Sequence, residues 1–456
     1  MASLWFECAL LPCGWARGVR LTARAGCIEQ VSIAVQPQPG DERHAIALPG
    51  LPNVHSHAFQ RGLAGLTERR AAGEDSFWSW RELMYRFVER IGPEELEAIS
   101  ALCFAEMLEA GFTHVGEFHY LHHDFDGRQF ANPGELAARI VAAAAHSGIG
   151  ITLLPVFYAH GGFGGAPPSP RQKRFVSDVD GFARILEACQ LATRPLAAAS
   201  VGVAPHSLRA VTPQELAAIV RLGQAGVVHL HIAEQVREVE ECQAWSGRRP
   251  IEWLLDSEPV GARWCLVHAT HATDTELEGI AACGAVAGLC PITESSLGDG
   301  IFAAAELRAR GGRFGIGSDS NIQLDAAAEL RTLEYSHRLA QRARNVLAAG
   351  TDASTGRTLF EDALAGGWRA LHADAAASPR GLVHGASLDV VTLAGGHPAL
   401  IERRDDELLD SWIFSGGREL IDCVWRAGER VVSGGRHRDR DALIARSARA
   451  LRKLRA

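Results

Sequence analysis

The sequence predicts an α/β fold: a (β/α)8 barrel of the TIM type, joined to a small β-sandwich domain built from the N- and C-terminal segments. The middle of the chain holds eight apolar, strand-like runs, each followed by a helical pattern. The first, fifth, sixth and eighth runs end on polar residues, and only a closed barrel places a first and an eighth strand side by side. Both ends of the chain instead alternate short apolar runs with turns, as antiparallel strands do.

These patterns divide the chain into three segments. Residues 1–47 are expected to form the N-terminal part of the sandwich, residues 48–375 the barrel, and residues 376–456 the C-terminal part of the sandwich plus a helical tail. The last segment has strand-like runs at 385–395, 411–416 and 422–435, and its basic tail from Arg436 is expected to be a solvated surface helix. Chain ends commonly lie close together, so the outer segments are expected to share one β unit.

The eight barrel strands are expected at residues 48–54, 112–118, 149–157, 198–204, 227–232, 262–267, 285–289 and 313–317. Several helices between them carry their own start signals. Thr212 and Thr273 each precede a glutamate three residues on, which is the pattern of a capping box. In the helix from Glu94, apolar residues recur with the helical period and are expected to pack on a sheet.

Composition and charge exclude several classes of partner. Of the 456 residues, 47% are hydrophobic and 22% charged, as in a globular protein, and the net charge of -8 argues against nucleic acid. The apolar stretches are too short to span a membrane, and Glu7 interrupts the apolar N-terminus, which argues against a signal peptide. The ten cysteines are scattered singly, as in reduced proteins. We expect a cytoplasmic homodimer that acts on a small molecule and binds neither nucleic acid nor membrane.

The pair His55 and His57 directly follows the apolar run of residues 45–54. Residues two apart on a strand point to the same side, so both imidazoles can bind one cation. Such a pair alone is weak evidence. Its weight comes from the polar residues that end three later strands, which are His231, Glu234, His268 and Asp319. In a barrel these strand ends lie around one mouth, and a metal site is expected there.

This ordered set resembles the amidohydrolase superfamily. Within it, the His231-x-x-Glu234 pattern is similar to that of the mononuclear aminohydrolases, which release ammonia. Members with two metals bridge them through a carboxylated lysine, and the chain has only Lys173, in a loop rich in glycine and proline, and Lys453. The resemblance therefore implies one metal ion per chain, zinc (Zn2+) or alternatively iron. The expected ligands are His55, His57, His231 and Asp319.

Three further segments resemble the formimidoylglutamate deiminases of bacterial histidine degradation. They are LPGLPNVHSHAFQRGLAG at 48–65, FHY at 118–120 and PHSLRAV at 205–211. The resemblance implies hydrolysis of N-formimidoyl-L-glutamate to N-formyl-L-glutamate and ammonia. It also implies substrate contacts from Gln60, Arg81 and Tyr120.

The chemistry of the residues predicts their roles. A zinc ion with an open position lowers the pKa of bound water to about 7. Asp319 is expected to accept the water's proton, Glu234 to carry a proton to the leaving nitrogen, and His268 to orient the water and the developing oxygen. Because the substrate has two carboxylates and arginine binds carboxylate through two hydrogen bonds, Arg209 is the first candidate for binding them, with His206 beside it.

Two other functions stay open on the sequence. A nucleobase or aminopurine deaminase of the guanine-deaminase type would use the same barrel and metal, but its pocket would stack a flat, neutral ring, and His206 with Arg209 argues against that. A catalytically silent scaffold would keep the barrel as an assembly surface. Such proteins commonly lose ligands, whereas this chain keeps the whole set.

Overall fold

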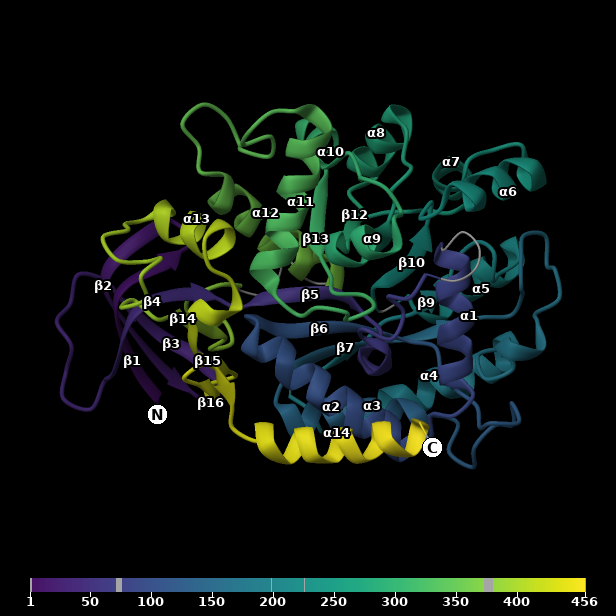
Figure 1. Cartoon of the computed structure of the whole chain (residues 1–456), viewed down its shortest axis with the longest axis horizontal. Helices are drawn as coiled ribbons and strands as arrows, with labels where there is room; N and C mark the ends of the chain where they lie inside the picture. The colour runs from purple at the N-terminus through teal and green to yellow at the C-terminus, as the bar shows by residue number, and fades with distance from the viewer. Residues whose placement is uncertain (1, 71–75, 198, 225, 373–379, 456) are drawn as a thin grey trace.

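The computed structural model describes residues 2–70, 76–197, 199–224, 226–372 and 380–455. Figure 1 shows two parts side by side: a sheet made by both ends of the chain, in purple and yellow, and a larger body of strands and helices, in blue to green. The C-terminal helix runs along one side of the larger body (Figure 1). The expected boundary between residues 375 and 376 lies outside the described residues.

The larger body is a barrel of parallel strands. The strands are β5 (Leu51–Ser56), β6 (Phe112–His119), β7 (Gly150–Phe157), β8 (Ser200–Val201), β9 (Ala204–Pro205), β10 (Val228–Ile232), β11 (Trp264–His268), β12 (Val286–Leu289) and β13 (Arg313–Ile316). β5 to β8 form one sheet, with β9 paired to β7, and β10 to β13 form another. A bridge from Val203 to Val228 joins the two sheets on one side. A second bridge, from Ser56 to Asp319, closes the ring, so the first and eighth strands are neighbours as predicted.

The fourth strand departs from the sequence prediction. It is split into β8 and β9 rather than continuous from residue 198 to 204, and residue 198 itself lies outside the described part. Gly202 lies between the two pieces, where an added Cβ would come within 2.6 Å of the Val227 carbonyl oxygen. The close approach of the fifth strand therefore requires glycine at this point.

Helices cover the outside of the barrel. They are α1 (Phe77–Val88), α2 (Pro93–Glu109), α3 (Glu135–Ser147), α4 (Val179–Thr193), α5 (Pro213–Leu222), α6 (Val236–Ser246), α7 (Pro250–Ser257), α8 (Asp274–Cys283), α9 (Pro291–Leu297), α10 (Ala304–Ala309), α11 (Ala326–Gln341) and α12 (Thr355–Leu371). The capping boxes at Thr212 and Thr273 are confirmed. The apolar stripe of α2 is buried, as predicted. In the described part of the chain, no helix is both long and apolar enough to cross a membrane.

Both ends of the chain form one eight-stranded sheet. Its strands are β1 (Ala2–Leu11), β2 (Gly14–Arg24), β3 (Cys27–Ser32), β4 (Glu42–Pro49), β14 (Val390–Leu393), β15 (Ile421–Arg426), β16 (Glu429–Ser433) and β17 (Arg436–His437), in the order β17-β16-β15-β14-β4-β1-β2-β3. The N–H of Ile28 donates to Ala386 O, and side chains from β1, β2, β3 and β15 share one core. The sheet is therefore folded over on itself, which gives the expected sandwich as one continuous sheet.

The predicted first barrel strand, residues 48–54, is divided between the two parts. β4 ends at Pro49 in the terminal sheet, and β5 begins at Leu51 in the barrel. Gly50 is the corner, where a Cβ would lie 2.3 Å from the Thr113 side chain. One apolar run thus supplies two strands, because glycine allows the chain to turn against β6.

Two C-terminal predictions are wrong. Residues 411–416 are not a strand, because Ser411 to Phe414 complete helix α13 (Asp406–Phe414). Its buried residues Leu408, Leu409, Trp412 and Ile413 follow the helical period. The tail forms α14 (Arg440–Arg455), but one face is packed on α2 rather than solvated.

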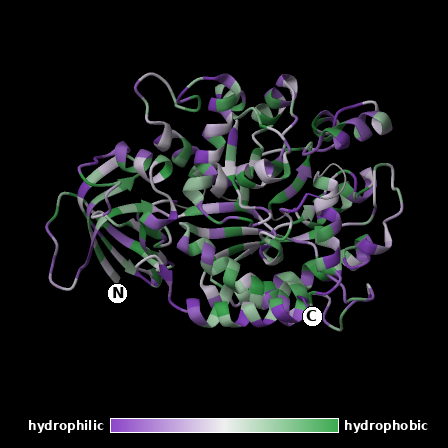
Figure 2. Cartoon of the chain, viewed as in Figure 1, coloured by the Kyte–Doolittle hydropathy of each residue, from purple (hydrophilic) through white to green (hydrophobic). Residues whose placement is uncertain are grey.

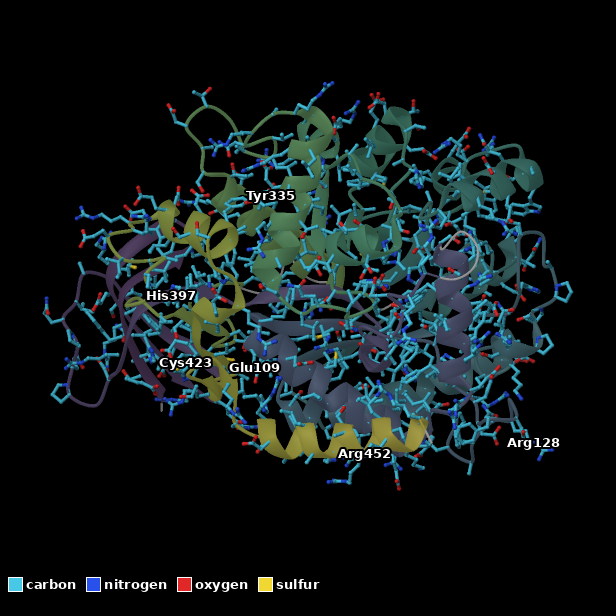
Figure 3. The ribbon with its side chains drawn as sticks, viewed as in Figure 1. Glu109, Arg128, Tyr335, His397, Cys423 and Arg452 are labelled. Carbon is cyan, nitrogen blue, oxygen red and sulfur yellow. The ribbon has the colours of Figure 1, made fainter. Side chains whose placement is uncertain are left out.

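The contact of α14 with α2 combines apolar and ionic groups. Leu443 and Leu454 are buried, and Arg440 reaches the carboxylate of Glu109. Figure 2 shows hydrophilic and hydrophobic residues alternating along α14, and Figure 3 labels Glu109 where the terminal sheet meets this helix. The basic tail therefore docks on the acidic side of α2. This contact could not be predicted from the sequence of the tail alone.

Candidate metal and substrate site

Three histidines and an aspartate meet at one mouth of the barrel. His55 lies near the end of β5 and His57 directly follows the strand, His231 belongs to β10, and Asp319 follows β13. All four side chains are buried, and their potential ligand atoms all lie within 4.8 Å of one another. Imidazole nitrogens with one carboxylate oxygen are ligands that suit zinc. The structure therefore brings together the predicted ligand set.

The distances within this group converge on one point. Asp319 Oδ1 lies 3.4 Å from His55 Nε2 and 3.3 Å from His57 Nε2. His231 Nε2 lies 3.0 Å from His55 Nε2. The Nδ1 atom of His57 donates to Phe118 O at 2.8 Å, and that of His231 donates to His206 O at 3.0 Å. These bonds leave the Nε2 lone pairs of both rings facing the centre, as metal binding requires.

Electrostatics prepare the group for a cation. Burial lowers the pKa of His55 to about 3 and also lowers the pKa values of His57 and His231, so the rings are neutral. Burial alone would raise the pKa of Asp319, but its hydrogen bond and charge interaction with His55, followed by His57 and His268, hold that pKa below its ordinary value. Neutral imidazoles beside an ionised carboxylate match the protonation state that a metal ion needs.

The loop that carries Asp319 is tied to the first strand. The N–H of His57 donates to Asp319 O, and the N–H of Asp319 donates to His55 O, both at 2.9 Å. The Asn321 amide donates to His57 O at 3.0 Å. Asp319 also has a left-handed φ of 42°. This strained backbone is held by bonds on both sides, and it turns the carboxylate toward the histidines.

His268 lies among three carboxylates. Its Nε2 is 3.8 Å from Glu234 Oε1 and 3.9 Å from Asp319 Oδ2, and its Nδ1 is 3.1 Å from Glu294 Oε1. Burial would lower the pKa of His268, but Glu234, then Glu294 and Asp319, raise it to about 10. Burial raises the pKa of Glu234 to about 7. The site thus holds a protonated imidazole beside a carboxyl group that can gain and lose a proton near neutral pH.

Glu238 anchors the loop of Glu234, and the sequence analysis missed it. This fully buried carboxylate accepts the N–H groups of Ala233 and Glu234, each at 3.1 Å. Its Oε2 also lies 4.0 Å from Arg209 Nη2. No feature of the sequence distinguishes Glu238 from the nearby Glu240 and Glu241. Only the fold turns one of these three side chains inward.

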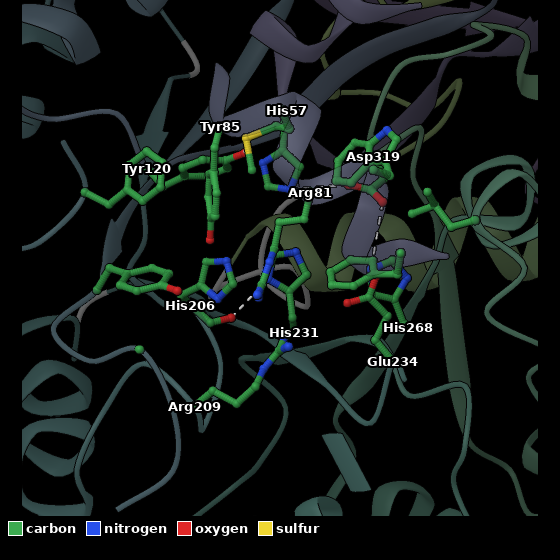
Figure 4. Close-up of a pocket in the computed structure, with 17 residues that line it drawn as sticks. His57, Arg81, Tyr85, Tyr120, His206, Arg209, His231, Glu234, His268 and Asp319 are labelled. Carbon is green, nitrogen blue, oxygen red and sulfur yellow. Dashed lines mark hydrogen bonds and ion pairs between the residues drawn. The ribbon is translucent and has the colours of Figure 1, made fainter. Parts of the chain in front are cut away.

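A cavity that is open to the outside adjoins the metal group. Four predicted substrate residues line it, and they are Arg81, Tyr120, His206 and Arg209. Figure 4 shows Arg81 and Arg209 extending toward His231 from opposite walls. Helix α1 provides much of one wall of the cavity. Of its lining residues, only Arg81 was predicted from the sequence. Its other lining side chains are Phe77, Trp80, Met84 and Tyr85.

Gln60 occupies a different place from the other predicted substrate residues. It does not line this cavity. Its amide nitrogen donates to the Tyr120 hydroxyl at 2.8 Å, so it lies behind Tyr120. In this structure Gln60 therefore positions Tyr120, whose hydroxyl is also 3.6 Å from Met84 Sδ.

Two guanidinium groups reach the cavity with unused donors. Arg209 Nη1 and Arg81 Nε are buried and have no hydrogen-bond partner among the described residues. A buried, unpaired cationic donor is costly, so both positions favour an anionic ligand. The cavity thus has a site for a metal cation at one end and two arginines for an anion near it.

Comparison with known proteins agrees with this geometry. Residues 46–355 match the amidohydrolase family, and residues 1–45 match the N-terminal domain of formimidoylglutamate deiminase HutF. The chain belongs to the amidohydrolase family, whose members depend on metal.

The most informative relative is the formimidoylglutamate deiminase of Pseudomonas aeruginosa. It is 49% identical over 455 residues, which cover 99% of this chain and 98% of that protein. The 8-oxoguanine deaminase of the same organism is 27% identical and aligns with 72% of each chain. Among solved structures, an amidohydrolase from Brucella melitensis matches with a TM-score of 0.96 and 51% identity over the full length of both chains. A zinc-bound adenosine deaminase from Xanthomonas campestris, at 22% identity and a TM-score of 0.80, covers 100% of this chain and 98% of its own and shares the fold.

Proposed function

We propose that this chain hydrolyses N-formimidoyl-L-glutamate to N-formyl-L-glutamate and ammonia, with one zinc ion bound per chain. The observation that carries the proposal is the cavity in which two arginines with unused donors lie close to a group of three histidines and an aspartate. The two carboxylates of this substrate would pair with the arginines at one end of the cavity, and its formimidoyl group would lie beside the metal group at the other end. The 49% identity to a formimidoylglutamate deiminase along nearly the whole chain supports it.

The metal would be held by His55, His57, His231 and Asp319. Bound there, zinc supplies a positive charge and a water of lowered pKa, about 7. Iron is the alternative metal, since the same imidazole and carboxylate ligands also suit it.

The chain's own residues move the protons. Asp319 stays ionised, and its Oδ2, on the side of His268, accepts a proton from the attacking water. Oxygen bonds to the formimidoyl carbon, and the protonated His268 faces the charge that develops on this oxygen. Glu234 then delivers a proton to the terminal nitrogen. When the formimidoyl group enters protonated, this proton completes ammonia and the carbon–nitrogen bond breaks. The hydroxyl left on the carbon returns its proton to Glu234 as the formyl carbonyl forms, and the proton on Asp319 leaves with ammonia as ammonium.

The other end of the substrate is bound by charge. Arg209 and Arg81 pair with the two carboxylates, because guanidinium and carboxylate form charge-assisted bonds. Tyr120 and His206 line the same cavity and supply further polar contacts, and Gln60 contributes by holding Tyr120.

Two arginines also separate this function from its alternatives. A pocket for a flat, neutral purine has no use for two guanidinium groups that each keep a buried donor without a partner, so we do not favour the guanine-deaminase type. A silent scaffold has no need for the complete group of ligands and proton carriers.

The proposal also covers the location of the protein in the cell, its oligomeric state and its division into segments. We propose a cytoplasmic homodimer, in keeping with the prevalence of symmetric dimers among soluble oligomers. We also propose the division into segments 1–47, 48–375 and 376–456. Light scattering of the purified chain tests the dimer.

A direct assay tests the proposed reaction. The purified, zinc-loaded chain is incubated with formimidoylglutamate, guanine, 8-oxoguanine or adenosine, and ammonia is measured. We expect ammonia from formimidoylglutamate, with N-formylglutamate as the second product by NMR. Faster release from a purine would replace the proposal with the deaminase alternative.

A further inference from the structure

Three arginines surround the indole of Trp78, and two of them, Arg81 and Arg209, also line the cavity. The guanidinium carbons of Arg81 and Arg237 each lie 4.5 Å from the centre of the Trp78 ring. The guanidinium carbon of Arg209 lies 5.9 Å from the same ring. These residues come from α1, from α6 and from the loop after β9. All three distances fall within the range of cation–π attraction.

The negative charges near this group lie beside Arg209, which Glu234 and Glu238 both stabilise, and beside Arg237. Arg209 faces Glu238 at 4.0 Å, and Arg237 pairs with Glu241 at 2.7 Å on the outside of α6. Arg81 makes no ion pair with any residue that the structure describes. Like charges gathered here repel one another, so they need either an anion or a π face to stay together.

The helix that carries Trp78 is held at both ends. Ser76 caps its start, where its side chain accepts the Trp78 N–H. At its far end, the buried Arg174 donates to the carbonyl oxygens of Val88 and Ile91. Trp78 therefore stands on a fixed element rather than a free loop, and its ring can hold the arginines in place.

We propose that Trp78 and Arg237 complete the part of the site that recognises a dianion. Trp78 is a positioning residue that holds Arg81 and Arg209 in the orientation that receives two carboxylates. Arg237, whose side chain is 60% exposed, is a rim cation that attracts the dianion before it enters. This inference rests on the proposed function, since it assigns the two carboxylates of that substrate to this cluster.

Substitution of Trp78 separates a positioning role from a packing role. Trp78→Leu keeps an apolar side chain but removes the π face, whereas Trp78→Phe keeps a π face. We expect Trp78→Leu to raise KM for formimidoylglutamate about tenfold with a much smaller change in kcat, and Trp78→Phe to restore most of the loss. Equal behaviour of Trp78→Leu and Trp78→Phe would overturn the positioning role.

Binding of glutarate gives a readout that needs no turnover. Glutarate is a five-carbon dianion with carboxylates spaced as in glutamate, and its affinity for the zinc-loaded protein is measured by calorimetry. We expect Trp78→Leu to weaken it about tenfold and Trp78→Phe to bind it nearly as wild type does. Unchanged affinity in Trp78→Leu overturns the inference. Wild-type glutarate binding without ammonia release would instead contradict the proposed function alone.

Arg237→Gln tests the rim charge against a matched control. Arg452→Gln makes the same change of charge at an exposed position on α14, labelled in Figure 3. We expect Arg237→Gln to lower kcat/KM severalfold at low salt, with the difference shrinking as salt rises, because steering is screened. Arg452→Gln should follow the wild-type salt curve. If Arg237→Gln also follows it, Arg237 attracts no substrate.

Discussion

At the scale of single residues, the site depends on Glu234 and on the side chains that fix its place. Glu234 faces His268 at 3.8 Å, and burial raises its pKa to about 7. Its backbone N–H is held by Glu238. A proton carrier needs both a suitable pKa and a fixed position. Burial provides the first for Glu234, and the bond to Glu238 provides the second.

Glu234→Gln tests the proton transfer. A carboxamide of the same shape cannot carry a proton to the leaving nitrogen, so kcat should fall by about 10² to 10⁴. The metal content, measured by elemental analysis, should stay that of wild type, since Glu234 is not among the four grouped ligands. Near-normal kcat in this variant would remove Glu234 from the mechanism.

Arg209 is tested by truncation and by exchange. Arg209→Ala should lower kcat/KM for formimidoylglutamate. The loss should correspond to about 2 to 5 kcal/mol of transition-state stabilisation, because one partner of a buried charge pair is lost. Arg209→Lys should recover only part of this, since an ammonium group cannot form the two-pronged bond. Steady-state ammonia release measures both, and unchanged kcat/KM in Arg209→Ala would reopen the purine interpretation.

Glu238→Gln tests whether one carboxylate serves two residues. The uncharged amide no longer pairs with Arg209 and offers only one oxygen to two N–H groups. We expect kcat/KM to fall about tenfold or more, in line with leaving buried polar groups unpaired. Glu240→Gln, at an exposed position on the same helix, is the control and should match wild type. Similar losses in both variants would argue for a general effect on α6.

The proposed ligand residues could be predicted from the sequence because each lies at or just after the end of a strand. His55, His231 and Asp319 follow apolar runs, and the order of those runs fixes where they meet. Glu238 and Trp78 could not be predicted, because each is one of several similar residues on a helix. Which of them turns toward the site depends on how that helix docks.

At the scale of elements, local glycines decide where the predicted strands begin and end. The run of residues 45–54 contains the turn-forming pair Pro49-Gly50, which the strand prediction passed over, and Gly50 is a corner between β4 and β5. The strand prediction for 411–416 failed for a related reason. Trp412 and Ile413 continue a helical stripe that starts at Leu408, and the short window hid that period.

Gly50→Ala tests the importance of the corner. A Cβ at this position would lie 2.3 Å from Thr113, so the neighbouring strand must shift. We expect the free energy of unfolding to fall by about 1 to 3 kcal/mol, as for overpacked cores. Urea unfolding measures it, with Gly396→Ala as the control, because nothing lies within 4 Å of a Cβ there. Equal stability of the two variants would show that β6 accommodates the methyl group.

At the scale of the whole molecule, the barrel collects distant parts of the chain at one mouth. Asp319 joins His55 and His57 only because the ring closes, and Arg209 and Arg81 then face the same cavity. The terminal sheet lies on the left in Figure 1, well separated from α1 on the right, the helix that supplies a wall of the cavity. The fold therefore places the proposed metal ligands, proton carriers and anion-binding arginines in or beside one cavity.

The most direct measurement is a zinc titration of the metal-free protein with ammonia release from formimidoylglutamate as the readout. We expect activity to rise linearly with added zinc and to reach its plateau at one zinc per chain, because one group of four residues would hold the ion. His231→Ala should not recover activity at that stoichiometry. A plateau at two zinc ions per chain, or full activity of the metal-free protein, would contradict catalysis by a single bound zinc.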